Sequence, residues 1–110
     1  MSWVRIDDGF ADHPKVVGLS DAAFRAHVRG MCYAARHRTD GHIPSAIVPT
    51  LAHTKALREL ESSGVWDRNG TGYVIHDWLD YNRSRDELRS LSEVRAQAGR
   101  RGGQSKSRSK

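Results

Sequence analysis

The stretch Val65-Trp66-Asp67-Arg68-Asn69-Gly70-Thr71-Gly72-Tyr73-Val74-Ile75 decides the fold, because it carries the strongest local signal in the chain. Two runs rich in β-branched and aromatic residues flank the central Asn-Gly dipeptide. Both of these residues tolerate the positive φ angles that a two-residue type I′ turn requires. We therefore predict a β-hairpin here, with positive φ at Asn69 and Gly70.

Two short helices are predicted immediately before this hairpin. Thr54 is expected to cap a helix over residues 55–63, and Gly64 is a typical C-terminal stop. The preceding segment, 45–53, is compatible either with a helix from its first residue or with one that starts at Pro49, where proline loses no helical hydrogen bond. A short polar turn between the two segments would make a helix-turn-helix.

The chain before this pair contains extended segments and one long helix. Residues 3–7 alternate apolar and polar side chains, the period of a half-buried strand, and residues 42–44 read as a short extended piece before a helix. Ser20 can cap a helix that reaches Arg38. Its expected apolar face consists of Phe24, Val28, Met31 and Ala35. The single cysteine, Cys32, is expected to behave as a small core residue.

A helix pair followed at once by a hairpin, with an N-terminal strand beside it, is the order of a winged helix. We therefore predict an α+β fold, mainly α: a winged helix-turn-helix with a small antiparallel sheet over residues 1–83. The residues expected in its core are Phe24, Val28, Met31, Leu57, Leu60, Val65, Trp66 and Trp78.

A C-terminal helix and a basic tail are predicted after this domain. Ser84 and Glu87 form a capping-box pattern that opens a helix over residues 84–98. The apolar stripe of this helix, Leu88, Leu91 and Val94, must cover either the body or a second copy, so a homodimer is one expectation. Residues 99–110 contain no strongly apolar side chain and are expected to be disordered when free.

Charge is distributed unevenly along the chain. Six of the 18 basic residues lie in 95–110, and no acid follows Glu93, so residues 1–94 carry 12 basic against 13 acidic side chains. The near-neutral body and the tail of +6 together favour a polyanionic partner, for which double-stranded DNA is the first expectation.

Several classes of protein are excluded by the composition. The longest apolar runs, such as residues 46–49, are too short to cross a bilayer, and the first residues form no hydrophobic signal core. A single cysteine allows no intramolecular disulfide, which favours the cytoplasm.

Metal binding and catalysis are not expected. The six histidines and one cysteine form no Cys-x2-Cys or His-x3-His pair, so we expect no metal and no cofactor. The aspartates at 7, 8, 77 and 80 are more typical of strand ends and helix caps than of a nuclease site. The sequence therefore favours a protein that is not an enzyme.

The expected DNA contacts lie on the second helix of the pair, at the hairpin tip and in the tail. Lys55 and Arg58 share one helix face that could enter a major groove, and Thr54 at the helix start could meet a phosphate. Glu59 and Glu61 leave this helix nearly neutral, which shifts part of the expected affinity to the tail. The remaining expected contacts are Arg68 and Asn69 at the hairpin tip and Arg95, Arg100, Arg101, Lys106, Arg108 and Lys110 in the tail.

Taken together, these segments resemble a known family. The resemblance is carried by Trp3-Val4-Arg5-Ile6-Asp7-Asp8, His13-Pro14-Lys15-Val16, Asp40-Gly41, Gly64-Val65-Trp66 and Gly72-Tyr73-Val74-Ile75-His76-Asp77-Trp78-Leu79-Asp80-Tyr81. Over about residues 2–85 the chain resembles the N-terminal winged-helix domain of phage replisome-organiser and replication-initiation proteins, of actinobacterial phage or mobile-element type. The resemblance implies origin-DNA binding in the host cytoplasm or nucleoid, a host protein partner and self-association. Larger relatives add a second domain after this one, so helicase loading is not carried over.

Two alternatives to a replication factor stay open. A transcriptional regulator would need the same groove contacts. A winged-helix protein-interaction module that binds a host or phage partner would instead use the long helix and the helix over 84–98, and the near-neutral body favours that interpretation.

Overall fold

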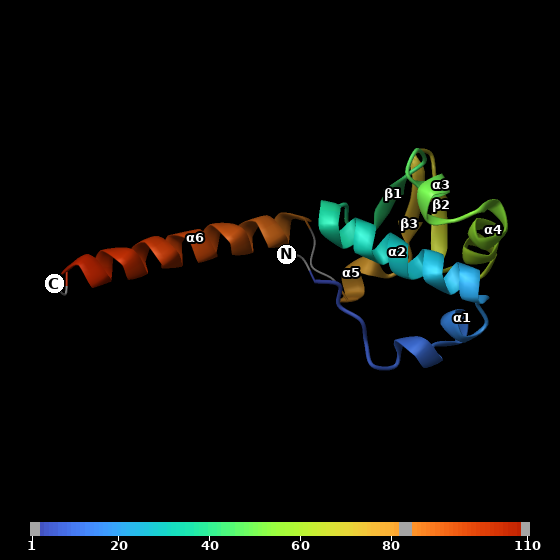
Figure 1. Ribbon diagram of the computed structural model, residues 1–110, viewed down its shortest axis with the longest axis horizontal. Coiled ribbons are helices and arrows are strands. Elements are labelled where there is room, and N and C mark those ends of the chain that lie inside the picture. Colours follow the sequence, from blue (N-terminus) through green and yellow to red (C-terminus); the bar gives the residue numbers. More distant parts are fainter. Residues whose placement is uncertain (1–2, 82–84, 109–110) are drawn as a thin grey trace.

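The computed structural model describes residues 3–81 and 85–108 (Figure 1). The protein is α+β and mainly helical, with one small antiparallel sheet. In chain order the elements are the 3-10 helix η1 (Phe10–Asp12), α1 (Pro14–Val17), α2 (Asp21–His37), β1 (His42–Pro44), α3 (Val48–Leu51), α4 (Thr54–Ser62), β2 (Trp66–Asn69), β3 (Gly72–Ile75), α5 (Trp78–Tyr81) and α6 (Arg85–Arg108).

Helix α2 begins where the sequence predicts, but its buried face is different. The Ser20 hydroxyl accepts a hydrogen bond from the Ala23 amide at 3.2 Å, which confirms the cap. The buried positions are mostly small: Ala23, Ala26, His27, Gly30, Met31, Ala34 and Ala35. They face inward because α2 packs closely on Trp66; a Cβ on Gly30 would lie 2.5 Å from the indole. The prediction that Phe24 is buried was therefore wrong, since this bulky residue is 37% exposed at the edge of the helix.

The third strand of the sheet is not the predicted one. The strand order is β1-β3-β2, and Ile43 of β1 pairs with Tyr73 of β3. Residues 3–7 form no strand, so the predicted N-terminal strand was wrong. β1 takes this place because the chain after α2 reverses through Arg38, Asp40 and Gly41, all at positive φ, and delivers the fully buried Ile43 directly to β3.

The predicted hairpin is present, but its turn differs from the prediction. Asn69 and Gly72 pair across a two-residue loop, and neither Asn69 nor Gly70 has positive φ. The Asn69 side chain instead accepts hydrogen bonds from the Thr71 amide at 3.0 Å and from its hydroxyl at 3.2 Å, a side-chain turn that needs no left-handed residue. The residue that must be glycine is Gly72, with φ of 151°, where a Cβ would collide with the carbonyl oxygen of Ile43.

The helix pair before the hairpin has a slightly different cap from the predicted one. Helix α3 begins at Val48 with Pro49 in its first turn, which is the later of the two starts that the sequence allows. His53, rather than Thr54, caps α4, because its Nδ1 accepts a hydrogen bond from the Ala56 amide at 3.2 Å.

The core lies between α2, α4 and the sheet. Trp66 is fully buried, and the predicted core residues Met31, Leu60, Val65 and Trp78 are also buried. Val28 and Leu57 are partly buried against this cluster.

Helix α6 is longer than predicted and projects away from the body (Figure 1). Ser84, the expected cap, lies outside the described residues, and the helix runs from Arg85 to Arg108, beyond residue 98 where the predicted helix ends. Extending an existing helix adds hydrogen bonds without a new nucleation step. Leu88 and Leu91 are half-buried and Val94 is 60% exposed, so the body leaves much of this apolar stripe uncovered.

Candidate nucleic-acid interface

The outer face of α4 is basic. Ala56 and Leu60 turn inward and are buried, whereas Lys55 and Arg58 lie on the opposite side of the helix and are exposed. In the part of the chain that the structure describes, neither cation forms an ion pair. Thr54, also exposed, forms the first residue of the helix beside them.

The two acids of α4 point sideways and are occupied by neighbouring elements. A carboxylate oxygen of Glu59 accepts hydrogen bonds from the Ser20 amide at 2.8 Å and from its hydroxyl at 2.9 Å, at the start of α2. Glu61 turns towards the hairpin and pairs with Arg68 at 3.2 Å. Helix α4 is nearly neutral in composition. Its two acids turn towards neighbouring elements, whereas Lys55 and Arg58 face the solvent, so the solvent-facing side of the helix is positive.

Arg68 joins the hairpin to α4 and does not extend freely from the tip. Its guanidinium donates to the Tyr73 hydroxyl at 3.1 Å and to Glu61 at 3.3 Å, and it lies 5.7 Å from the Tyr73 ring centroid. The hydrogen bond to Tyr73 and the charge of Glu61 raise the pKa of Arg68. The predicted DNA contact at Arg68 therefore has an existing structural role.

Asn69 is likewise committed to the structure of the hairpin tip. Besides closing the turn, its side-chain amide lies 3.3 Å from Nδ1 of His42 on β1. Nε2 of His42 lies 3.4 Å from the Thr71 hydroxyl. Sequence reasoning missed this contact because His42 is 27 residues away from Asn69 and its strand was not expected to join the sheet.

A row of arginines on α2 was also missed. Arg25, Arg29 and Arg36 recur at helical spacing on the side opposite the buried residues, and all three are exposed. Cys32 lies on the same side and is exposed, so its expected place in the core was wrong. None of the three arginines forms an ion pair with any residue that the structure describes. The i, i+4, i+11 spacing could have revealed the row from the sequence.

Two of these arginines border a groove beside the start of α4. Arg25 and Arg29 line it from α2, and Thr50 and His53 line it from α3 and the following turn. The groove has a volume of about 350 Å³. It connects the arginine row to the helix that carries Lys55 and Arg58.

The charges of the body are separated between its segments. Residues 22–58, which include α3, the exposed start of α4 and all of α2 except its first residue Asp21, contain six basic residues and one acid, a net charge of +5. Residues 3–21 and 59–81 together contain three basic and nine acidic residues, a net charge of −6. The net charge of the body is thus near zero although residues 22–58 are basic. The predicted wing lies within residues 59–81, which belong to the acidic part.

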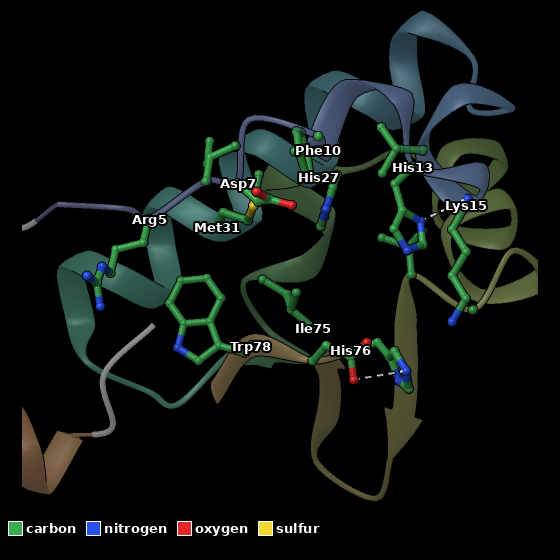
Figure 2. Close-up of a pocket in the computed structure, with 16 residues that line it drawn as sticks. Arg5, Asp7, Phe10, His13, Lys15, His27, Met31, Ile75, His76 and Trp78 are labelled. Atoms are coloured by element: carbon green, nitrogen blue, oxygen red, sulfur yellow. Dashed lines mark hydrogen bonds and ion pairs between the residues drawn. The ribbon is translucent and has the colours of Figure 1, made fainter. Parts of the chain in front are cut away.

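A second hollow lies on the other side of α2, under the N-terminal segment (Figure 2). It has a volume of about 110 Å³, with Phe10, Met31, Ile75 and Trp78 among its walls. The charged residues that line it are Arg5, Asp7, Lys15 and Asp77, together with His13 and His76.

His27 borders this hollow and is part of the core. It is 4% exposed, and its Nδ1 accepts a hydrogen bond from the Trp66 indole at 3.0 Å. Burial lowers the pKa of His27 to about 4, so the ring is neutral at pH 7 and its proton lies on Nε2.

The predicted tail contacts are placed on the outer part of α6. Arg95 is exposed, and the backbone at Arg100, Arg101, Lys106 and Arg108 is helical. Lys110 lies outside the described residues.

In the described ranges 3–81 and 85–108, no three His, Cys, Asp or Glu side chains gather as a metal site would require. No helix in those ranges is long and apolar enough to cross a membrane. Comparison with protein-family models, with curated proteins and with solved structures finds no match for this chain.

Proposed function

We propose that the protein is a non-catalytic DNA-binding protein built as a winged helix-turn-helix, with α3 and α4 as the helix pair and β2–β3 as the wing. The observation that supports this most is the outer face of α4, where Lys55 and Arg58 are exposed while Glu59 and Glu61 are held by Ser20 and Arg68. A helix with such a face can lie in a major groove and present long cationic side chains to base edges and phosphates.

The charge distribution supports a duplex as the partner. Phosphate neutralisation by Lys and Arg supplies most of the affinity in protein–DNA binding. The basic segment 22–58 includes the start of α4, and the basic part of α6 adds a second cationic region. The hairpin over residues 66–75 carries one acid, Asp67, and one base, Arg68, and the base is held by Glu61. In this proposal the wing therefore supports α4 through Arg68 and makes few phosphate contacts of its own.

We propose replication initiation in a phage or mobile element, or its regulation, as the process. This step rests on the sequence resemblance given above. A transcriptional regulator would place the same α4 face in the groove, and only the location of the cognate site in a genome distinguishes the two roles.

The test of this function separates base contacts from phosphate contacts. A duplex selected from a random pool by the full chain and a scrambled duplex are titrated with wild type and with K55A/R58A. We expect the double variant to lose about 1–3 kcal/mol of preference for the selected duplex if either side chain reads a base edge. Lys15→Gln is the matched control, because this exposed lysine lies in the acidic segment 3–21. Equal losses in K15Q and K55A/R58A would contradict the proposal.

A protein-interaction module is the second candidate, and the uncovered stripe on α6 favours it. Val94 of α6 is 60% exposed and Leu79 of α5 is 56% exposed, and the ribbon of α6 projects away from that of residues 3–81 (Figure 1). Under this alternative, duplex binding would be weak and would show no preference for any sequence.

A further inference from the structure

We propose that the groove between α2 and the α3–α4 turn is a contact site for the phosphate backbone of the duplex, with Arg25 and Arg29 as its anion-binding side chains. This inference rests on the proposed DNA-binding function and adds a surface to it. The groove lies beside the start of α4, so a backbone strand held there would run along the edge of the major groove that α4 enters.

The arginine row differs from an ordinary solvated helix face. Exposed helix faces usually mix Glu or Asp with Lys or Arg, because opposite charges at i, i+4 stabilise the helix. The only acid of α2 is its first residue, Asp21, which forms no ion pair in the described part of the chain. Arg25 and Arg29 are like charges at i, i+4 and repel each other. A polyanion bound across them would relieve this repulsion.

The length of the arginine row favours binding of a chain of phosphates over binding of a single small anion. Arg25 and Arg36 are 11 residues apart, which corresponds to about 16 Å along a helix at 1.5 Å per residue. Phosphates follow each other every ~3.4 Å along the axis on one strand, so the row is long enough to follow several of them.

The groove is the place where a contact between the arginine row and phosphates would lie closest to α4. Arg25 and Arg29 line one wall, and Thr50 and His53 line the other. Guanidinium groups bind phosphate oxygens through two parallel hydrogen bonds, and both arginines are exposed with no ion-pair partner in the described part of the chain. An acidic protein segment could use the same cations, but the groove reaches Ala56 of α4, the helix that carries Lys55 and Arg58, and this favours DNA.

The first test measures salt dependence with the full chain. Binding of fluorescent selected and scrambled duplexes is followed by anisotropy over a series of salt concentrations for wild type, R25Q, R29Q and the control K15Q. Gln is a good helix former, so the substitutions preserve α2. Each arginine variant should weaken binding to both duplexes by the same factor and reduce the slope of log K against log salt by up to ~0.9, the value for one lost phosphate contact.

The second test uses Cys32, the only cysteine, which is exposed on the same face between Arg29 and Arg36. A saturating duplex should slow alkylation of the Cys32 thiol severalfold, because the bound backbone would cover this face.

The outcomes distinguish the two proposals. If wild type binds the duplex but R25Q and R29Q show the same slope as K15Q, and the duplex leaves the alkylation rate of Cys32 unchanged, the groove proposal is wrong. The α4 proposal then still stands. Absence of salt-dependent binding by wild type removes both.

Discussion

His27 is buried beneath Phe10 and holds the Trp66 indole at the centre of the core, so acid should weaken the fold through this side chain. The two rings His27 and Phe10 lie 5.6 Å apart, and the His27 Nδ1 accepts the only N–H that the Trp66 indole can donate. Protonation at Nδ1 would break that hydrogen bond and place a charge in an apolar environment. The folded state therefore disfavours the protonated ring.

The size of the effect follows from the difference in pKa between the two states. Burial lowers the pKa of His27 from 6.5 to about 4 in the folded protein, and the unfolded chain should titrate near the unperturbed value. Between these values the unfolded state binds more protons, so stability is complete above pH 6.5 and is lost as the pH falls towards 4. Each unit of pKa difference corresponds to ~1.4 kcal/mol, which gives a loss of roughly 3 kcal/mol for this one group.

The assay is urea unfolding at intervals from pH 7.5 to pH 4, followed by tryptophan fluorescence, for wild type and H27Q. Glutamine can still accept from the Trp66 N–H through its side-chain oxygen but does not titrate, and all other ionisable groups are common to both proteins. We expect the free energy of unfolding of wild type to fall more steeply below pH 6.5, by up to ~1.4 kcal/mol per pH unit more than that of H27Q. Parallel pH profiles for the two proteins would refute the assignment of His27 as a buried neutral residue.

Three further changes test the fold. Gly72→Val should destabilise the protein by about 1–3 kcal/mol or more through backbone strain. Gly70→Val should have little effect, because Gly70 is at ordinary φ with open space around it. Equal losses of stability for the two variants on thermal unfolding would contradict the observed turn. Trp66→Ala should cost about 3–5 kcal/mol in urea unfolding, and a loss below ~1 kcal/mol would be inconsistent with its complete burial. If a second copy covers the α6 stripe, L88Q/L91Q should reduce the mass measured by light scattering to that of a monomer; an unchanged monomer mass in both proteins would exclude self-association through α6.

The elements with local signals were predictable from the sequence. The Ser20 cap, the long helix α2 and the hairpin follow from capping chemistry, helical periodicity and β-propensity over a few residues. The third strand was not predictable in the same way, because residues 3–7 and 42–44 both read as extended segments. Pairing with β3 selected 42–44 through tertiary contacts of Ile43 that no local pattern reveals.

The buried face of α2 illustrates a second limit. Hydrophobicity alone placed Phe24 inward, but close packing against Trp66 requires small residues, so the alanines and Gly30 face the core. The same rotation places Arg25 and Arg29 on the outer face, which is why the groove was missed. The cationic residues of α4 were predicted, whereas the roles of Glu59 and Glu61 depend on Ser20 and Arg68, which only the folded structure brings close.

The central claim, that this protein binds duplex DNA through the basic face formed by α2 and α4, is tested most directly by the affinity of the intact chain for a random duplex at several salt concentrations. We predict a straight line of negative slope in a plot of log K against log salt, because cation–phosphate contacts release counterions. We also predict that K55A/R58A flattens this line while K15Q does not. Binding that is independent of salt, or absent at low salt, would contradict the account and favour a protein partner.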